Sequence, residues 1–333
     1  MKLKRLGRTG LKVSEICLGT MTFGAQADES SSFDILNRSA DAGVNFIDTA
    51  DIYPVPVSPE TAGRTEEIVG KWLKGRRERF ILATKCRAKM GDNPWDEGLS
   101  RKHILHAVEQ SLRRLGTDYI DLYQTHGPDA ETPIEETLTA LNDLVRSGKV
   151  RYIGCSNYSA RLLLKSLWMS DKYMLSRYDC VQPRYNLLFR QIEDELLPLC
   201  REEGVGVIVY NPLAGGFLTG KHRLETPVEG SRFDIMPSGS IYHNRYWKQE
   251  AFEAVSLLQD FFVSRNKSLA QAAIAWTLHQ NGITSAILGA SRVEQLDQTL
   301  SAVDMELDSE ELEMCSDIWF RLPRERDPVL ALR

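Results

Sequence analysis

The chain has 333 residues, of which 42% are hydrophobic and 26% are charged, and its formal net charge at pH 7 is −5. This composition allows one large core and has no basic excess that would attract nucleic acid, so we exclude a nucleic-acid partner. The first residues lack the apolar core of a signal peptide, and no apolar run approaches the roughly 18 residues of a membrane span. We therefore expect a cytoplasmic protein that acts on a small molecule and does not bind membranes.

Short apolar runs alternate with segments of helical periodicity along the chain. The apolar runs predict strands at 16–20, 44–48, 80–85, 118–123, 150–155, 180–183, 206–210 and 286–290. Helical segments follow the first six runs, at 30–42, 65–74, 100–115, 134–147, 160–168 and 192–203. Apolar strands separated by helices indicate an α/β protein with a parallel sheet, and eight such units favour a (β/α)8 TIM barrel over two doubly wound halves.

Further features complete the predicted architecture. The stretch 2–16 predicts a small β-hairpin that turns at Gly7–Gly10 and covers the barrel floor. Two long loops, at 54–64 and 211–248, are expected to cover a ligand at the C-terminal face of the barrel. No shift in composition marks a boundary, so we predict a single domain over residues 1–333 and leave its oligomeric state open. The six cysteines form no CxxC pair and are expected to be buried, reduced thiols.

Polar or small residues stand where each predicted strand ends. In a (β/α)8 barrel these ends meet at the carboxyl face, where active sites are built. Each residue alone has an ordinary structural explanation, such as a helix cap or a solvated side chain, but their convergence on one mouth indicates a site. The residues are Gly19, Thr20, Asp48, Lys85, His126, Ser156, Asn157, Gln182, Tyr210, Asn211, Gly289, Ser291 and Arg292.

This set of side chains is suited to protonating an oxyanion. A tyrosine hydroxyl has an ordinary pKa of about 10, and a lysine ammonium within about 4–6 Å can lower that pKa by one to three units. Asp48 is expected to hold Lys85 charged and in place. Tyr53 would act as the acid, and His126 would hydrogen-bond a carbonyl oxygen of the substrate. Asp51 is expected to be a solvated turn residue without a chemical role.

Four stretches of the sequence resemble motifs of the aldo-keto reductases. "GVNFIDTADIY" resembles the G-x4-D-[ST]-A-x2-Y element and places Asp48 and Tyr53 at its functional positions. "ATK" at Lys85 and "QTH" at His126 resemble the other two elements of a catalytic tetrad, and "LVRSGKVRYIGCSNYS" resembles a further conserved element. The resemblance covers nearly the whole chain. "YNPLAGGFLTGK" is most similar to the bacterial branch related to potassium-channel β-subunits.

The resemblance implies a barrel that binds a nicotinamide dinucleotide without a Rossmann domain and reduces aldehydes or ketones by hydride transfer. The implied catalytic residues are Asp48, Tyr53, Lys85 and His126. The residues implied in cofactor binding are Gly19, Thr20, Met21, Asp48, Ser156, Asn157, Gln182, Tyr210, Asn211, Pro212, Leu213, Gly215, Leu218, Gly220, Lys221, Arg232, Gly289, Ser291, Arg292, Gln295 and Gln298. The implied substrate pocket contains Phe23, Tyr53, Trp95, His126 and Tyr158, with residues of the 222–248 loop such as Tyr242 or Trp247.

The choice of cofactor depends on the region after the last predicted strand. An arginine such as Arg292 can make paired hydrogen bonds to a 2′-phosphate, so NADPH is the preferred cofactor and NADH the alternative. The chain departs from the family pattern there, because it reads "ILGAS" where one branch has an "IPKS"-like element. It also has Gln298 and Thr299 where channel-related members carry a Glu-Asn pair. Both departures concern the adenosine end of the cofactor.

Other functions are compatible with some of these residues. Lys85 is a candidate Schiff-base nucleophile of a lyase or aldolase, and the channel-related branch allows a cofactor-binding regulatory subunit with little turnover. "GGFLTGKH" nearly matches a P-loop, but His222 replaces the hydroxyl that would bind Mg²⁺, so we predict no NTPase. His103 and His106 lie on a predicted helix without a third ligand nearby, which favours a solvated helical face, and no metal is predicted.

Overall fold

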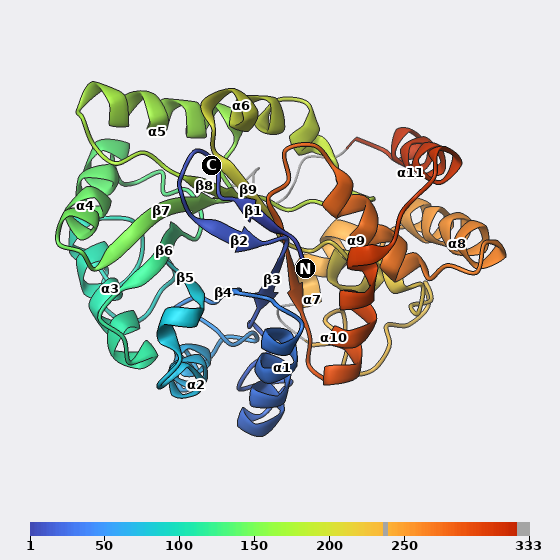
Figure 1. Ribbon diagram of the computed structural model, residues 1–333, viewed down its shortest axis with the longest axis horizontal. Helices are drawn as coiled ribbons and strands as arrows, with labels where there is room; N and C mark the ends of the chain where they lie inside the picture. Colours follow the sequence, from blue (N-terminus) through green and yellow to red (C-terminus); the bar gives the residue numbers. More distant parts are fainter. Residues whose placement is uncertain (236–238, 325–333) are drawn as a thin grey trace.

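The computed structural model describes residues 1–235 and 239–324 of the chain. Eight parallel strands form a closed barrel in the order β10-β3-β4-β5-β6-β7-β8-β9, so this sheet has no open edge. Helices surround the outside of the barrel (Figure 1). The predicted (β/α)8 TIM barrel is confirmed. Residues 236–238 of the predicted second loop and residues 325–333 of the predicted domain lie outside the described residues.

The barrel strands lie close to the predicted apolar runs. They are β3 (Ile16–Gly19), β4 (Phe46–Asp48), β5 (Ile81–Cys86), β6 (Ile120–Thr125), β7 (Val150–Ser156), β8 (Cys180–Gln182), β9 (Gly206–Val209) and β10 (Ser285–Gly289). The helices are α1 (Glu29–Asp41), α2 (Arg64–Leu73), α3 (Arg101–Leu115), α4 (Ile134–Arg146), α5 (Ala160–Lys172), α6 (Leu196–Glu203), α7 (Gly239–Tyr246), α8 (Gln249–Ser264), α9 (Leu269–His279), α10 (Val293–Leu300) and α11 (Ser309–Arg321). Predicted and observed bounds differ by a few residues, as expected for element ends.

Capping residues set the ends of several helices. The side chain of Ser100 accepts a hydrogen bond from the backbone N of His103 and so begins α3. The same helix ends at Gly116, whose φ of 62° is a left-handed conformation that glycine adopts without strain. Asp308 and Glu311 form a capping box at the start of α11. These local interactions set where the helices begin and end, whereas the predicted helix ranges came from periodicity.

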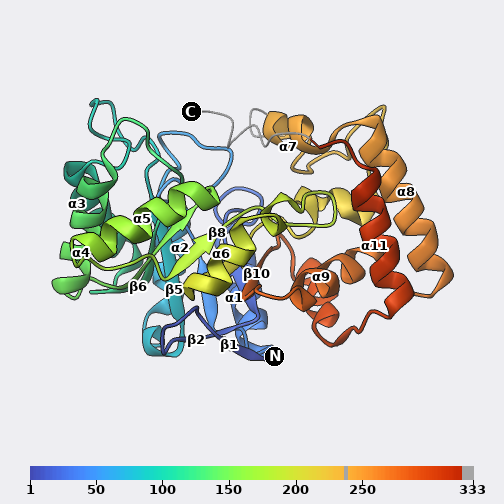
Figure 2. The same ribbon diagram turned by 90° about the horizontal axis from the view of Figure 1, so that it is seen from above.

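An antiparallel hairpin closes one end of the barrel. It consists of β1 (Leu3–Arg5) and β2 (Lys12–Ser14), and Leu6 and Val13 are fully buried against inward-facing residues of the barrel. Gly7 turns the hairpin at a φ of 55°, and a Cβ there would lie 2.4 Å from a backbone oxygen of the α6–β9 connection. Figure 2 shows the hairpin at one end of the barrel and α7 at the other. The predicted floor hairpin is confirmed.

The C-terminal face carries two long connections. Residues 49–63 join β4 to α2, and residues 210–248 join β9 to α8. The second connection contains the 3-10 helix η3 (Ala214–Thr219) and α7, so the predicted loop is partly helical. Both lie at the barrel mouth because they follow the C-terminal ends of parallel strands.

The structure bears on two further predictions, which concern the cysteines and membrane-spanning segments. All six cysteines are buried and none forms a disulfide, in agreement with the prediction of reduced thiols. Within residues 1–235 and 239–324, no helix has the length and apolar character needed to cross a membrane.

Candidate active site

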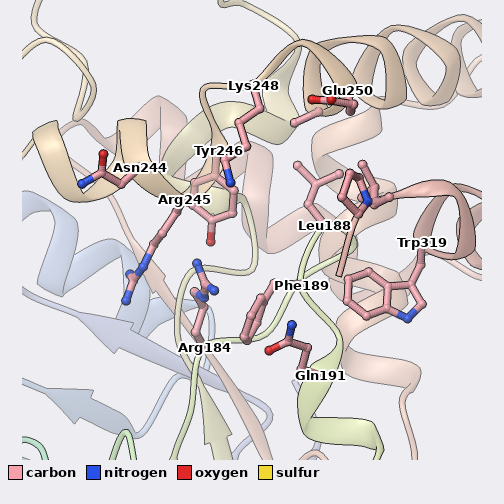
Figure 3. Close-up of a pocket in the computed structure, with 13 residues that line it drawn as sticks. Arg184, Leu188, Phe189, Gln191, Asn244, Arg245, Tyr246, Lys248, Glu250 and Trp319 are labelled. Carbon is pink, nitrogen blue, oxygen red and sulfur yellow. The ribbon is translucent and has the colours of Figure 1, made fainter. Parts of the chain in front are cut away.

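A small cavity beside the barrel mouth is not the candidate active site. It lies between the β8–α6 connection, α7 and α11, and Figure 3 shows side chains such as Arg184, Phe189, Tyr246 and Trp319 around it. Its volume is about 60 Å³. None of the predicted catalytic residues lines it. The cavity is therefore too small to hold a cofactor with a substrate.

A buried ion pair lies at the C-terminal ends of two neighbouring strands. Asp48 ends β4, and Lys85 stands near the end of the adjacent β5. Lys85 Nζ lies 2.5 Å from Asp48 Oδ2 and donates a second hydrogen bond to the carbonyl oxygen of Thr49 at 2.8 Å, with the side chains of Lys85 and Asp48 only 0% and 4% exposed. Burial lowers the pKa of Lys85, but the charge of Asp48 and the hydrogen bond to it outweigh burial and raise the pKa above its ordinary value. Lys85 therefore stays charged at this depth.

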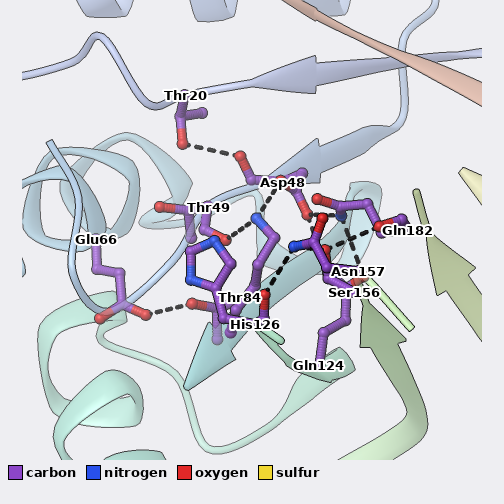
Figure 4. Close-up of polar contacts among 11 residues, drawn as sticks. Thr20, Asp48, Thr49, Glu66, Thr84, Gln124, His126, Ser156, Asn157 and Gln182 are labelled. Atoms are coloured by element: carbon purple, nitrogen blue, oxygen red, sulfur yellow. Dashed lines mark hydrogen bonds and ion pairs between the residues drawn. The ribbon is translucent and has the colours of Figure 1, made fainter. Parts of the chain in front are cut away.

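The other carboxylate oxygen of Asp48 is satisfied by two amides. Gln124 Nε2 and Gln182 Nε2 each lie 3.0 Å from Asp48 Oδ1 (Figure 4). With Lys85 on Oδ2, the carboxylate accepts three side-chain hydrogen bonds. These bonds hold the carboxylate in place for its contact with Lys85.

The connection after β4 carries Tyr53 back to this ion pair. The backbone N of Tyr53 donates to Ala50 O at 3.2 Å, and its carbonyl accepts from the backbone N of Gly63 at 3.0 Å. Lys85 Nζ lies 5.0 Å from the centroid of the Tyr53 ring. Burial raises the pKa of Tyr53, and the charge of Lys85 opposes this rise. The expectation that Lys85 lowers this pKa below its ordinary value is therefore wrong, because burial outweighs the ammonium.

His126 stands edge-on to Tyr53. Their ring centroids are 5.7 Å apart at an interplanar angle of 80°. Burial, followed by the charges of Lys85 and Arg87, lowers the pKa of His126 to about 3. The imidazole is therefore neutral at pH 7, and it can donate one hydrogen bond without adding a charge to the site.

A cavity of about 290 Å³ opens above these residues. Asp48, Tyr53 and His126 line it, and Lys85 lies beneath. The other predicted residues that line it are Gly19, Thr20, Met21, Ser156, Asn157, Gln182, Tyr210, Asn211, Arg232 and Gly289, together with Tyr242. Sequence reasoning missed Ile52, Val55, Ile241, Arg245 and Ile287. The first two flank Tyr53 and could have been found from it, whereas no strand-end pattern indicates residues on α7.

A groove of about 370 Å³ continues from this cavity, since the two share Asn211, Arg232, Ile287 and Gly289. The predicted cofactor residues that line only the groove are Pro212, Leu213, Gly215, Lys221, Ser291, Arg292, Gln295 and Gln298. Residues that were not predicted to bind the cofactor also line it, namely Thr22, Gln26, Gly216, Thr219, Gly230, Ser231, Ala270, Leu288, Ala290 and Thr299. Leu218 and Gly220 line neither space, because Leu218 is fully buried in the core and Gly220 faces Gln259.

Three cations share this groove and favour an anionic ligand. Burial, followed by the charges of Arg292 and Arg232, lowers the pKa of Lys221. The three positive charges therefore repel one another when no anion lies between them. Backbone in the left-handed conformation at Gly215 and Gly216 lines the same groove, and such turns are suited to phosphate. The groove fits the diphosphate of a dinucleotide.

Three residues predicted for the substrate pocket lie elsewhere. Phe23 is fully buried in the hydrophobic core, and Tyr158 is buried edge-on against Tyr178 at a centroid distance of 5.7 Å. Trp95 is 47% exposed, with Lys102 Nζ 3.8 Å from its ring centroid. None of the three lines the cavity above Asp48. Sequence does not determine toward which side of the barrel wall each of these rings turns.

Asp51 is fully buried, so the expectation of a solvated turn residue is wrong. Its backbone N donates to Lys85 O at 3.1 Å. Neither of its carboxyl oxygens makes a hydrogen bond within the described ranges. Burial, followed by the charge of Glu66, raises the pKa of Asp51 well above its ordinary value, although Arg114 opposes the rise. Burial without a hydrogen-bond donor on the carboxyl oxygens therefore favours the protonated form of Asp51.

The two histidines of α3 differ in exposure. His106 is exposed as predicted, but His103 is buried, and burial lowers its pKa. The solvated face expected for this pair is therefore wrong for His103. Among the residues that the structure describes, no three His, Cys, Asp or Glu side chains are grouped as a metal site requires.

Comparisons with known proteins place the chain in a family. The model of the Aldo/keto reductase family matches residues 15–319. The chain is 40% identical to the uncharacterized oxidoreductase YrpG of Bacillus subtilis (strain 168), over 96% of each chain. It is 37% identical to a probable voltage-gated potassium channel subunit beta of Arabidopsis thaliana, over 92% of each chain. It is also 35% identical to protein tas of Escherichia coli (strain K12), over 94% of this chain and 96% of the relative. The resemblance in the motifs is thus confirmed, and the chain belongs to the aldo/keto reductase family.

Proposed function

We propose that this chain is an NADPH-dependent oxidoreductase that reduces aldehydes or ketones to alcohols. The observation that carries the proposal is the buried Asp48–Lys85 pair beside Tyr53, at the base of a cavity that continues into a cationic groove. Membership of the aldo/keto reductase family supports carbonyl reduction with a nicotinamide cofactor in general. To this we add the preference for NADPH and the roles of individual residues.

The residues of the chain act on the carbonyl oxygen. A nicotinamide cofactor, when bound in this cavity, would supply the hydride needed to reduce the carbonyl group. Tyr53 donates its phenolic proton to the alkoxide that develops, and the Lys85 ammonium stabilises the phenolate left behind. Asp48 keeps Lys85 protonated and in place. His126 donates a hydrogen bond to the substrate oxygen and so orients it toward Tyr53.

The raised pKa of Tyr53 is compatible with this role. Burial keeps the hydroxyl of Tyr53 protonated before the reaction, so it can donate a proton at neutral pH. As the proton leaves, the attraction between phenolate and ammonium grows, and this attraction is stronger in a buried site than in water. Lys85 therefore stabilises the transition state more than the ground state, which is the condition for catalysis.

The adenosine end of the groove supports NADPH. Arg292 precedes α10, so a 2′-phosphate there would meet both a guanidinium and a helix N-terminus. Gln295 Oε1 accepts hydrogen bonds from the backbone N and the Oγ of Ser291 at 2.9 and 3.2 Å, and thereby shapes this turn. We expect Arg292→Ala to weaken NADPH binding by about ten- to a hundredfold and to leave NADH binding nearly unchanged. Fluorescence titration with both cofactors checks this, and equal losses would show that Arg292 does not read the 2′-phosphate.

The substitution Tyr53→Phe tests the reaction itself. It is expected to lower carbonyl reduction by about 10²–10⁴-fold, the usual contribution of a general acid, while NADPH binding stays nearly unchanged. The measurement is the fall in NADPH absorbance with a panel of aldehydes and ketones. A variant that keeps more than about a tenth of wild-type turnover would remove Tyr53 from the role of acid.

Two alternatives differ from the proposal in measurable ways. A Schiff-base lyase requires an uncharged amine, but Lys85 is an ammonium bonded to Asp48 with a raised pKa, so borohydride should trap no substrate on it. The likeness to a probable potassium channel subunit beta supports a regulatory subunit with little turnover as second candidate. Tight NADPH binding without consumption of any carbonyl compound by the wild type would favour that candidate.

A further inference from the structure

We propose that Gln124 is a positioning residue that fixes the orientation of the Gln182 amide and, through it, the recognition of the cofactor's carboxamide. The inference rests on the proposed function for the identity of the cofactor. Gln124 lies on β6, is fully buried and lines neither the cavity nor the groove. It therefore acts on a ligand only through its neighbours.

Three side chains from alternate strands meet inside the barrel (Figure 4). Asp48 ends β4, Gln124 lies on β6 and Gln182 ends β8, and inward side chains of alternate barrel strands share a layer. Gln124 Nε2 and Gln182 Nε2 both donate to Asp48 Oδ1 at 3.0 Å. Gln182 Nε2 also donates to Gln124 Oε1 at 3.1 Å. The three side chains form a closed triangle of hydrogen bonds.

The charge of Asp48 determines which way the two amides point. A carboxylate paired with Lys85 only accepts hydrogen bonds, so each amide must turn its NH₂ group toward it. Gln182 has two amide hydrogens, and both are used, one by Asp48 and the other by Gln124. Its carbonyl oxygen is the remaining polar atom of the amide. Because Gln182 lines the cavity, this oxygen is available to accept a hydrogen bond from a ligand.

The polar side chains next to Gln182 already form hydrogen bonds with other groups of the protein. Asn157 Nδ2 donates to His126 O at 3.0 Å and to Ser156 Oγ at 3.1 Å, and Asn157 Oδ1 accepts from Tyr210 OH at 2.8 Å. The hydroxyl of Ser156 donates to the main-chain oxygen of Gln182 at 2.8 Å. An acceptor at Gln182 selects a ligand with an N–H donor, and the carboxamide of nicotinamide carries an NH₂ group. Without Gln124, one hydrogen of Gln182 loses its partner, and the amide is free to rotate.

The test compares NADP⁺ with its 3-acetylpyridine analogue, in which a methyl group replaces the amide NH₂. Binding of each to the full chain is measured by titration calorimetry. The wild type is expected to bind NADP⁺ about three- to tenfold more tightly, the value of one hydrogen bond. Gln124→Leu should abolish most of this preference by weakening NADP⁺ alone. In Gln124→Glu the buried carboxyl group beside Asp48 is expected to take up a proton, so that it donates to Asp48, still accepts from Gln182 and retains the preference.

Tyr123→Phe is the matched control for these variants. Tyr123 precedes Gln124 on the same strand, but its ring is buried in the outer core. Loss of its hydroxyl should leave the preference unchanged. If Gln124→Leu does not fold, Gln124→Met replaces it with an unbranched apolar side chain of similar length.

Several outcomes would overturn the inference. The preference could persist in the Leu or Met variant, both cofactors could lose affinity equally, or Gln124→Glu could lose the preference as the Leu variant does. A wild type that binds neither cofactor would overturn the proposed function and the inference together. A wild type that discriminates, with variants that discriminate equally well, would overturn the inference alone.

Discussion

Two buried clusters of charged and polar residues lie on opposite sides of the barrel wall and satisfy their carboxyl groups differently. The inner cluster lies at the barrel mouth and consists of Asp48, Lys85, Gln124 and Gln182. The outer cluster lies against α2 and α3 and consists of Asp51, Thr84, Glu66 and Arg114. Asp48 accepts three side-chain hydrogen bonds, whereas Asp51 makes none within the described ranges. These two aspartates lie only three positions apart in the chain.

Hydrogen-bonding partners, and not depth, distinguish the buried carboxyl groups of this protein. Glu66 is fully buried, yet it accepts from Thr84 Oγ1 at 2.5 Å and from Arg114 Nε at 2.7 Å. Asp51 is equally buried and lacks such donors, so its pKa rises. The inner cluster differs from the Glu66–Arg114 pair because the cavity lined by Asp48 opens above it. Its ion pair can therefore interact with a ligand, whereas the Glu66–Arg114 pair joins helices.

Breaking the inner cluster should have the largest effect. Asp48→Asn removes the charge that raises the pKa of Lys85 and leaves the ammonium buried beside the Thr49 carbonyl. Turnover is expected to fall by at least about 100-fold, because the acid depends on this ammonium. Asp51→Asn is the matched control from the outer cluster and should leave turnover unchanged. Equal losses in kcat would show that the two clusters do not differ in function.

Breaking the outer pair should reduce stability instead of chemistry. Arg114→Met leaves Glu66 buried without its ion-pair partner, since the two side chains are 18% and 0% exposed. The free energy of unfolding is expected to fall by about 3–5 kcal/mol, measured by denaturant titration. Arg101→Met is the control, because Arg101 and its partner Asp143 are 45% and 41% exposed and their pair is worth about 0–1 kcal/mol. Similar losses in both variants would contradict the role of burial.

The unpaired aspartate should have the smallest effect, and that effect should depend on pH. The pKa of Asp51 is raised in the folded chain, so the native state binds more protons than the unfolded state, and stability is lost as pH rises above about 4 through the folded pKa. Asp51→Asn removes this loss. We expect the variant to melt at a higher temperature than the wild type at about pH 8, by an amount on the order of a few °C that shrinks toward about pH 4. Parallel stability–pH profiles would argue against a buried, protonated Asp51.

Motif and periodicity were sufficient for the barrel and for the meeting of the tetrad. Apolar runs of strand length alternate with helical segments, and this alternation predicts the barrel. Consecutive parallel strands end at the same face, so Asp48 and Lys85 lie close together whatever path the loops take. In the cationic groove, Arg292 was indicated by its place after the last strand, whereas Lys221 and Arg232 were indicated only by the family resemblance. Tyr53 needed the motif as well, because the path of the connection after β4 is not fixed by periodicity.

Other features depended on the folded chain. Which side of the barrel wall a ring or carboxyl group faces was not readable for Phe23, Tyr158 or Asp51, because a loop after a strand obeys no period of two. Gln124 was equally hidden, since its partners Asp48 and Gln182 lie 76 and 58 positions away in the chain. Sequence alone was sufficient to predict the strands, the helices and the face at which the strands end, because local periodicity and connectivity determine them. Contacts between distant strands, and the pKa values that follow from them, arise only when the barrel closes and brings those strands into one layer.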